Sequence, residues 1–290
     1  MTVELAGTIP PMATPVTGRD GDVDHEALRA FTRRLTEGGV HGLFPCGSNG
    51  EFTSLTDDQR RAVIDTVADA AGDTPVLAGV GGTSVRGVVE RARAAAESGA
   101  DAAVVVTPYY MPATQDGLRD FFAAVADGSP LPVVLYDLPA LVGDSLSVDS
   151  VVALADHDNV VGLKDSTGDL SRLHKVLTRT PADFAVLQGS TVDGLPSLDF
   201  GADGIVAGEA NVDPAAVAEV YDAFVAGDRE RSVSVLRERV FPINDAITDV
   251  PTIPALKHLA AQTAGIDLGP PLPPLPELSD DERETAERVL

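Results

Sequence analysis

The sequence is constrained most by a repeated alternation between two hydrophobic periods. Short β-branched runs recur about eight times, and stretches whose apolar residues return every three or four positions lie between them. The short runs cover residues 7–14, 42–45, 75–79, 102–106, 132–136, 160–164, 185–188 and 204–206. The helical stretches include residues 24–37, 57–71, 83–98, 115–127 and 213–225. Eight such units predict an α/β fold of the (β/α)8 TIM-barrel class, because parallel strands joined by helices can close on themselves.

The alternation stops after Gly227, and the remaining helical patterns cover residues 229–240, 254–264 and 279–289. The sequence therefore predicts a catalytic barrel over residues 1–226 and a C-terminal helical appendage over residues 227–290. The run LGPPLPPLPEL leads straight into the last helix, so we interpret it as a stiff connector rather than a docking motif.

Glycines mark several predicted helix ends. Gly38, Gly72 and Gly99 each follow a helical stretch. A residue with left-handed backbone geometry is expected at such ends, and glycine adopts it most readily.

The charge balance argues against several classes of partner. The chain carries 45 acidic and 21 basic residues, for a formal net charge of -24. Such a field repels phosphate backbones and anionic lipid, so we expect neither a nucleic acid nor a membrane partner. Only three of the basic residues are lysines, namely Lys164, Lys175 and Lys257. An acid-rich chain with so few lysines indicates a halophilic source.

The single cysteine, Cys46, has no partner for an internal disulfide, which is typical of a reducing cytosol. The first fifteen residues lack a basic segment followed by a long apolar run, and no apolar run long enough to span a membrane occurs elsewhere. These features predict a cytoplasmic location.

Candidate catalytic residues lie where predicted strands end, because a barrel of this class builds its site from the C-terminal ends of its strands. Lys164 ends the run 160–164, and three of the four tyrosines, Tyr109, Tyr110 and Tyr136, lie at or just after the ends of two earlier runs. A simpler interpretation is that the lysine pairs with Asp165 or another carboxylate and that the tyrosines only pack.

Another candidate is the turn Gly47-Ser48-Asn49-Gly50-Glu51, whose backbone N–H groups could hold an anion, although an ordinary polar turn would look the same. The sequence lacks the motifs of nucleotide and metal sites. Gly79-Val80-Gly81-Gly82 is followed by Ser84 where a dinucleotide fingerprint needs glycine, and the five histidines are scattered. We therefore predict no nucleotide cofactor and no metal.

Five ordered motifs resemble those of the dihydrodipicolinate synthase / N-acetylneuraminate lyase family. They are Gly47-Ser48-Asn49-Gly50-Glu51, Thr107-Pro108-Tyr109-Tyr110, Tyr136-Asp137-Leu138-Pro139, Gly162-Leu163-Lys164-Asp165, and the stretch from Gly204 to Asn211. The resemblance covers most of the chain. It implies a (β/α)8 barrel, usually a homotetramer, that uses or releases the 2-oxo acid pyruvate and needs no cofactor beyond an imine with it.

Residue roles follow from the resemblance by position. Lys164 is similar to the Schiff-base lysine and Tyr136 to the tyrosine that moves protons. Tyr110 resembles the tyrosine that reaches a neighbouring subunit's site, and Tyr109 is its companion. Pyruvate and the rest of the substrate would contact Gly47, Ser48, Asn49, Thr167 and Val206. Asn49 and Asp137 depart from the residues most members carry, Thr and Asn respectively.

The loop after the Tyr136 motif bears on the substrate. Dihydrodipicolinate synthases carry an arginine there for the aldehyde's carboxylate, whereas this chain has Leu141. Archaeal sugar-acid aldolases of double specificity carry an arginine for a substrate phosphate where this chain has Ala113.

These positions predict reversible cleavage of a 2-keto-3-deoxy sugar acid, such as 2-keto-3-deoxygluconate or its 6-phosphate, to pyruvate and an aldehyde. Sugar-acid cleavage ranks first, N-acetylneuraminate lyase second and dihydrodipicolinate synthase third. A non-catalytic 2-oxo-acid-binding protein is the alternative from another class. Catalysis would need the neutral amine of Lys164, which burial favours.

Overall fold

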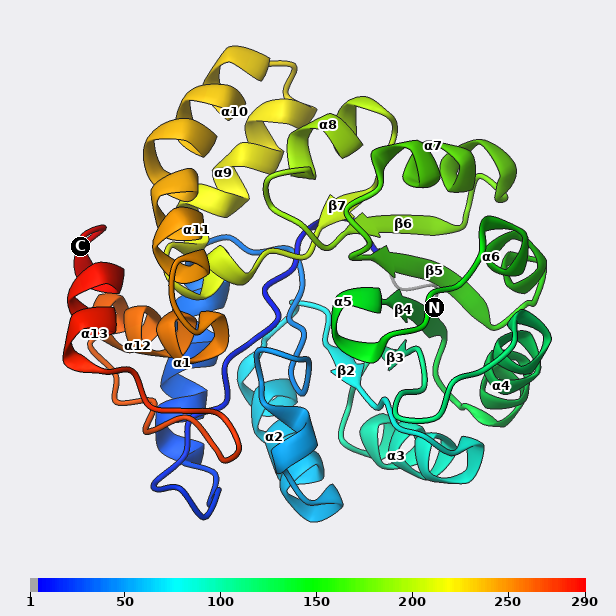
Figure 1. Ribbon diagram of the computed structural model, residues 1–290, viewed down its shortest axis with the longest axis horizontal. Coiled ribbons are helices and arrows are strands. Elements are labelled where there is room, and N and C mark those ends of the chain that lie inside the picture. The colour runs from blue at the N-terminus through cyan, green and yellow to red at the C-terminus, as the bar shows by residue number, and fades with distance from the viewer. Residues whose placement is uncertain (1–4) are drawn as a thin grey trace. The chain divides into compact units, whose positions relative to one another are not determined.

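The computed structural model describes residues 5–290, which divide into two compact units. Unit 1 comprises residues 5–6 and Leu77–Val206, and unit 2 comprises Gly7–Val76 and Ala207–Leu290. Strands alternate with helices along unit 1, whereas unit 2 is mainly helical (Figure 1).

Unit 1 is a parallel sheet with a helix after most strands. Its strands are β2 (Leu77–Gly79), β3 (Ala102–Val106), β4 (Val133–Asp137), β5 (Val160–Asp165), β6 (Ala185–Gln188) and β7 (Gly204–Ile205). Each pairs in parallel with the next in chain order. Its helices are α3 (Val85–Glu97), α4 (Gln115–Gly128), α5 (Pro139–Val142), α6 (Val148–Ala155), α7 (Leu170–Arg179) and α8 (Gly194–Asp199). Figure 1 shows α3, α4, α6 and α7 along the outer side of the strands.

The strands of unit 1 are almost entirely buried, which explains their continuous apolar sequence. Every residue of β3 and of β4 is buried. A strand that is buried on both faces does not alternate between apolar and polar residues. All the strands run in the same direction, so Tyr136 near the end of β4 and Lys164 near the end of β5 lie at the same edge.

Unit 2 begins with one short strand and is otherwise helical. It contains β1 (Gly7–Thr8), α1 (His25–Glu37), the 3-10 turn η1 (Phe52–Ser54), α2 (Asp57–Ala70), the 3-10 turn η2 (Gly208–Asn211) and α9 (Pro214–Val225). It continues through α10 (Arg229–Val235), a π-helical segment η3 (Leu236–Val240), α11 (Phe241–Thr248), α12 (Thr252–Ala264) and α13 (Asp280–Glu287). The last three helices share an apolar core that includes Ile243, Leu256 and Leu278.

The helical predictions are confirmed to within a few residues, whereas two predicted strands of unit 2 are shorter than expected. The run 7–14 forms a strand only at Gly7–Thr8, because Pro10 and Pro11 have no N–H to donate to a ladder. The run 42–45 makes only single parallel bridges, from Phe44 to Pro11 and from Leu43 to Val76.

One predicted helix end is wrong by a residue. Gly38 keeps right-handed geometry with φ −73°, and Gly39 adopts the left-handed geometry with φ +83°. Gly38 is required for another reason, since a Cβ there would lie 2.6 Å from the Pro214 Cβ. Gly72 and Gly99 are left-handed as predicted.

Candidate active site

The structure brings together the two residues that the sequence placed at the centre of the chemistry. Lys164 and Tyr136 are register partners on neighbouring strands, and the Lys164 Nζ lies 3.9 Å from the centroid of the Tyr136 ring. Each residue is only 5% exposed. A lysine amine held against an aromatic face in a mostly dry environment is unusual, because a lysine is seldom buried.

Hydrogen bonds fix the backbone at the strand ends around Tyr136 and Lys164. Thr107 follows β3, and both its N–H and its hydroxyl donate to the Tyr136 carbonyl, at 2.9 and 3.2 Å. Val206 follows β7 and is buried, and its N–H donates to the Gln188 carbonyl at 2.7 Å. Thr167 follows β5, where its N–H and hydroxyl both donate to Asp165 Oδ1.

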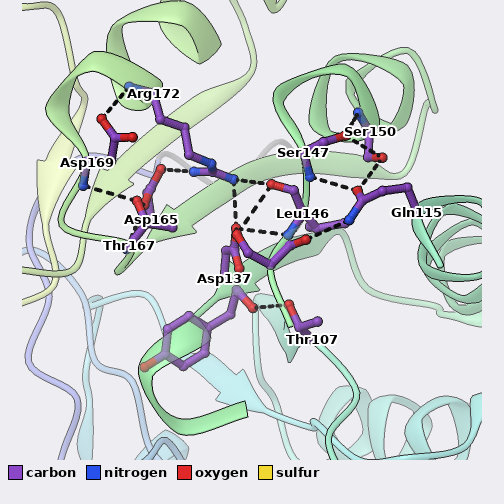
Figure 2. Close-up of polar contacts among 12 residues, drawn as sticks. Thr107, Gln115, Asp137, Leu146, Ser147, Ser150, Asp165, Thr167, Asp169 and Arg172 are labelled. Atoms are coloured by element: carbon purple, nitrogen blue, oxygen red, sulfur yellow. Dashed lines mark hydrogen bonds and ion pairs between the residues drawn. The ribbon is translucent and has the colours of Figure 1, made fainter. Parts of the chain in front are cut away.

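A buried ionic group lies beside this pair, and the sequence analysis missed it. Arg172, in the first turn of α7, binds the Asp137 and Asp165 carboxylates, which are the residues immediately after Tyr136 and Lys164 (Figure 2). We call Asp137, Arg172 and Asp165 the Arg172 clamp. The only signal in the sequence was the aspartate at position 137 where asparagine is common, because such a carboxylate needs a cation when it is buried.

Burial changes the acidity of one carboxyl of the Arg172 clamp. Desolvation raises the pKa of the Asp137 carboxyl to about 6, although the Arg172 guanidinium and the Ser145 hydroxyl both act to lower it. The Asp137 Oδ1 atom is buried and has no hydrogen-bond partner among the described residues.

The two tyrosines of the Thr107 motif differ in environment. Tyr110 is 91% exposed and has a left-handed backbone with φ +79°, which is rare for a residue with a side chain. Tyr109 is half-buried. The chain itself therefore presents the Tyr110 ring to the outside.

The turn from Gly47 to Glu51 belongs to unit 2 and is held rigidly. The N–H groups of Gly50 and Glu51 donate to the carbonyls of Gly47 and Ser48, each at 3.1 Å. Ser48 and Asn49 are half-buried. Glu51 is buried, left-handed with φ +55°, and forms an ion pair with Lys257 at 2.8 Å.

The described residues give no sign of thiol chemistry, of a metal site or of a membrane-spanning helix. Burial raises the pKa of the Cys46 thiol to about 12, so it is not a nucleophile at neutral pH. Among residues 5–290, no group of three or more His, Cys, Asp or Glu side chains could hold a metal ion. No helix in that part of the chain is long and apolar enough to cross a membrane.

A parallel α/β protein that holds a buried lysine against a tyrosine at neighbouring strand ends has the arrangement of a lyase that works through a lysine imine. The model of the dihydrodipicolinate synthetase family matches residues 4–290, and the chain belongs to that family. It is a pyruvate-dependent carbon–carbon lyase. Enzymes of this family hold pyruvate as a Schiff base on a lysine and need no separate cofactor, which confirms the prediction on cofactors.

Named relatives and solved structures agree with this assignment. A 4-hydroxy-tetrahydrodipicolinate synthase of Methanopyrus kandleri is 36% identical over 100% of this chain and 97% of its own. A DapA-like lyase of Halobacterium salinarum is 37% identical over 99% and 93%. The crystal structure of dihydrodipicolinate synthase DapA-2 from Bacillus anthracis superposes with a TM-score of 0.93 at 30% identity, covering 100% of this chain and 98% of that one.

A further solved structure contains a bound 2-oxo acid. YagE, an Escherichia coli prophage protein of the same family, was crystallised in complex with pyruvate. It superposes with a TM-score of 0.92 at 30% identity, over 98% of this chain and 97% of its own.

Proposed function

We propose that the chain is a class I aldolase in which Lys164 forms the imine with pyruvate and Tyr136 moves protons to and from the substrate. One observation carries the proposal, namely the 3.9 Å approach of the Lys164 Nζ to the Tyr136 ring at the buried ends of β5 and β4. Two scarce residue types meet at the edge where enzymes of this class bind substrate.

The chemistry follows from these two groups. The neutral Lys164 amine attacks the pyruvate C2 carbonyl, and loss of water leaves a protonated imine that withdraws electrons from C3. Tyr136, left as the phenolate after it protonates the departing water, takes a C3 proton to give an enamine, which attacks the aldehyde carbon. Tyr136 supplies a proton to the alkoxide that develops there, and water then hydrolyses the imine. Cleavage of an aldol runs the same steps in reverse.

The remaining assignments rest on the resemblance in sequence. Gly47, Ser48 and Asn49 would bind the pyruvate carboxylate, and Thr167, Val206 and Tyr109 would contact the rest of the substrate. The exposed Tyr110 is consistent with a tyrosine that serves a neighbouring subunit of a homotetramer. The fold as a whole would be a closed (β/α)8 barrel with a C-terminal helical region, as expected from the similarity to solved members.

The names of the relatives favour a different substrate from the sugar acid that the sequence predicted. Several archaeal relatives at 34–36% identity are named 4-hydroxy-tetrahydrodipicolinate synthase. Condensation of pyruvate with aspartate semialdehyde, which the sequence placed third, is thus better supported than cleavage of a sugar acid.

One observation keeps sugar-acid cleavage as a second candidate. Leu141 occupies the position of the expected arginine in α5 and is 67% exposed, so this residue offers no cation for a carboxylate. A charge-assisted hydrogen bond lost there would weaken aspartate semialdehyde binding by about 1.5–3 kcal/mol.

Two experiments test these statements in turn. Borohydride added with pyruvate should reduce the imine to a stable amine on Lys164, detected as a mass increase in that peptide. An adduct on Lys175 or Lys257, or none, would reject the assignment. Comparison of kcat/KM for aspartate semialdehyde condensation and for 2-keto-3-deoxygluconate cleavage then identifies the aldehyde.

A further inference from the structure

The Arg172 clamp connects three elements at the edge that carries Lys164 and Tyr136. Arg172 Nη2 donates to Asp137 Oδ2 at 2.7 Å, and Nη1 donates to Asp165 Oδ2. Nη2 also donates to the Leu146 carbonyl at 2.8 Å. The Arg172 side chain is 11% exposed and both carboxylates are buried, so water screens these contacts weakly.

The position of Arg172 in α7 explains its reach. Asp169 caps the helix by accepting from the Arg172 N–H at 2.9 Å, which places Arg172 in the first turn. Helical side chains tilt toward the N-terminus, so the guanidinium extends beyond the helix start toward the strand ends. Figure 2 shows it between Asp137 and Asp165.

The strand register shows what the Arg172 clamp controls. Tyr136 pairs with Lys164, and the next residues along, Asp137 and Asp165, pair with each other. Successive side chains of a strand point to opposite faces. Arg172 therefore holds the two strand ends together from the face opposite the Lys164–Tyr136 pair.

The hydrogen bonds of the Arg172 clamp extend into the loop that contains Ser145 and Leu146. Asp137 Oδ2 also accepts from the Ser145 hydroxyl at 2.8 Å and from the Leu146 N–H at 3.2 Å. Gln115 joins this loop from the start of α4, where its amide donates to the Ser145 carbonyl at 2.8 Å and accepts from the Ser147 N–H at 2.7 Å. Figure 2 shows Gln115 and Ser147 joined in this way.

The Arg172 clamp carries one more negative charge than positive charge. Two carboxylates face one guanidinium, and Arg172 from α7 and Asp165 from β5 are the charged groups that act on Asp137. Loss of Arg172 would leave two buried like charges side by side, which must separate or take up a proton. Separation would move the strand ends that carry Tyr136 and Lys164, and a protonated pair would still lack the guanidinium that joins them.

We propose that Arg172 is a positioning residue for catalysis, one that sets the distance between Tyr136 and Lys164 by clamping Asp137 to Asp165. The inference rests on the proposed roles of Lys164 and Tyr136. Because proton transfer depends steeply on geometry, a shift of about 1 Å can slow it by about 10²-fold. Imine formation, which needs only the lysine and pyruvate, is affected less.

The test measures two steps separately and needs no aldehyde. Borohydride trapping of pyruvate reports the imine on Lys164, and exchange of the pyruvate methyl protons in D2O, followed by proton NMR, reports proton transfer. In Arg172→Gln we expect trapping to reach the wild-type extent and exchange to fall about 10²-fold. Loss of Arg172 removes the charge that lowers the pKa of the Asp137 carboxyl, so exchange should decline further relative to wild type as the pH rises and this carboxyl ionises.

Three further variants separate positioning from folding. Asp137→Asn combined with Arg172→Gln restores the net charge of the Arg172 clamp and leaves amide side chains that can hydrogen-bond in place of the ion pairs, so exchange should return to within about 10-fold of wild type. Arg172→Lys keeps the charge but replaces the planar two-pronged guanidinium by one compact ammonium that fixes the two carboxylates less precisely, so exchange should fall about 10-fold. Arg179→Gln, on the exposed side of α7, breaks only a surface pair with Asp149 and should leave exchange unchanged.

Several outcomes would overturn the inference. One is a folded Arg172→Gln or Arg172→Lys that exchanges at the wild-type rate. Another is an equal loss of trapping and exchange that the double variant does not restore, because that pattern indicates general destabilisation. If Arg172→Gln does not fold, Arg172→Lys and the double variant give the answer. Failure of the wild type to trap pyruvate would reject the proposed function instead.

Discussion

At the scale of single residues, adjacent positions in one strand serve different purposes. Tyr136 and Asp137 follow each other in β4, yet Tyr136 lies against Lys164 and Asp137 is bound by Arg172. The alternation of side chains along a strand produces this separation. A substitution at either position therefore tests a different property of the site.

Replacement of Tyr136 by phenylalanine tests its role as a proton carrier. Tyr136→Phe removes one hydroxyl and leaves the ring packing and Lys164 intact. We expect aldol turnover to fall by about 10²–10⁴-fold while pyruvate trapping persists. Steady-state rates and intact mass after borohydride reduction measure the two effects. Turnover within a few-fold of wild type would mean that another group moves the proton.

Replacement of Asp137 by asparagine tests the buried charge. Burial raises the pKa of the Asp137 carboxyl from 3.8 to about 6, so the folded chain holds this proton more tightly than the unfolded chain does. The contribution of this proton to the free energy of unfolding is therefore fully present below pH 3.8, and it is lost as the pH rises through 6. Asp137→Asn should therefore gain stability relative to wild type by about 2–3 kcal/mol between pH 4 and 7. Urea unfolding of both proteins across this range is the measurement, and parallel curves would contradict it.

At the scale of elements, one buried ion pair fixes the turn from Gly47 to Glu51. Lys257 from α12 donates to Glu51 Oε1 at 2.8 Å and to the Pro270 carbonyl at 2.9 Å. The other Glu51 oxygen accepts from the Leu272 N–H. The same two side chains thus hold the turn and the proline-rich segment that precedes α13.

Loss of one member of this pair should be costly. Lys257→Met leaves the Glu51 carboxylate buried without its cation, and we expect the free energy of unfolding to fall by about 3–5 kcal/mol. Lys257→Met combined with Glu51→Gln should recover part of that loss, which denaturant titration can measure. Arg19→Ala breaks the exposed pair with Glu277 and serves as the control, with an effect below about 1 kcal/mol. Equal effects of Lys257→Met and Arg19→Ala would show that burial of the pair is unimportant.

At the scale of the whole molecule, the net charge of -24 predicts a dependence on salt. Surface carboxylates repel one another across distances that salt shortens, from a screening length of about 10 Å at 0.1 M to about 3 Å at 1 M. Both the melting temperature and the activity should therefore rise with salt. Thermal scans and rates measured from dilute buffer to molar potassium chloride test this prediction, and maximal values in dilute buffer would refute the halophilic interpretation.

Some of the predictions for the whole molecule are confirmed by the comparisons and others are not tested by them. The family and the lyase class are confirmed, while the preference for sugar acids drawn from Leu141 and Ala113 has less support than the synthase named for several relatives. A missing arginine shows what one position cannot bind, but another part of a site can supply the same charge. The division at residue 227 and the homotetramer stay predictions.

The sequence by itself determined the alternation of elements and the two residues of the proposed chemistry. Apolar period and helix signals are local, and the ends of parallel strands must meet at one edge, so Lys164 and three tyrosines could be placed at that edge in advance, and the resemblance to the family then singled out Lys164 and Tyr136. Only the tertiary structure decided that Arg172 binds Asp137 and Asp165 and that Lys257 binds Glu51. The physical reason is that an ion pair between residues distant in sequence leaves no periodic signal, since its partners are chosen by the folded geometry and by the cost of burying each charge alone.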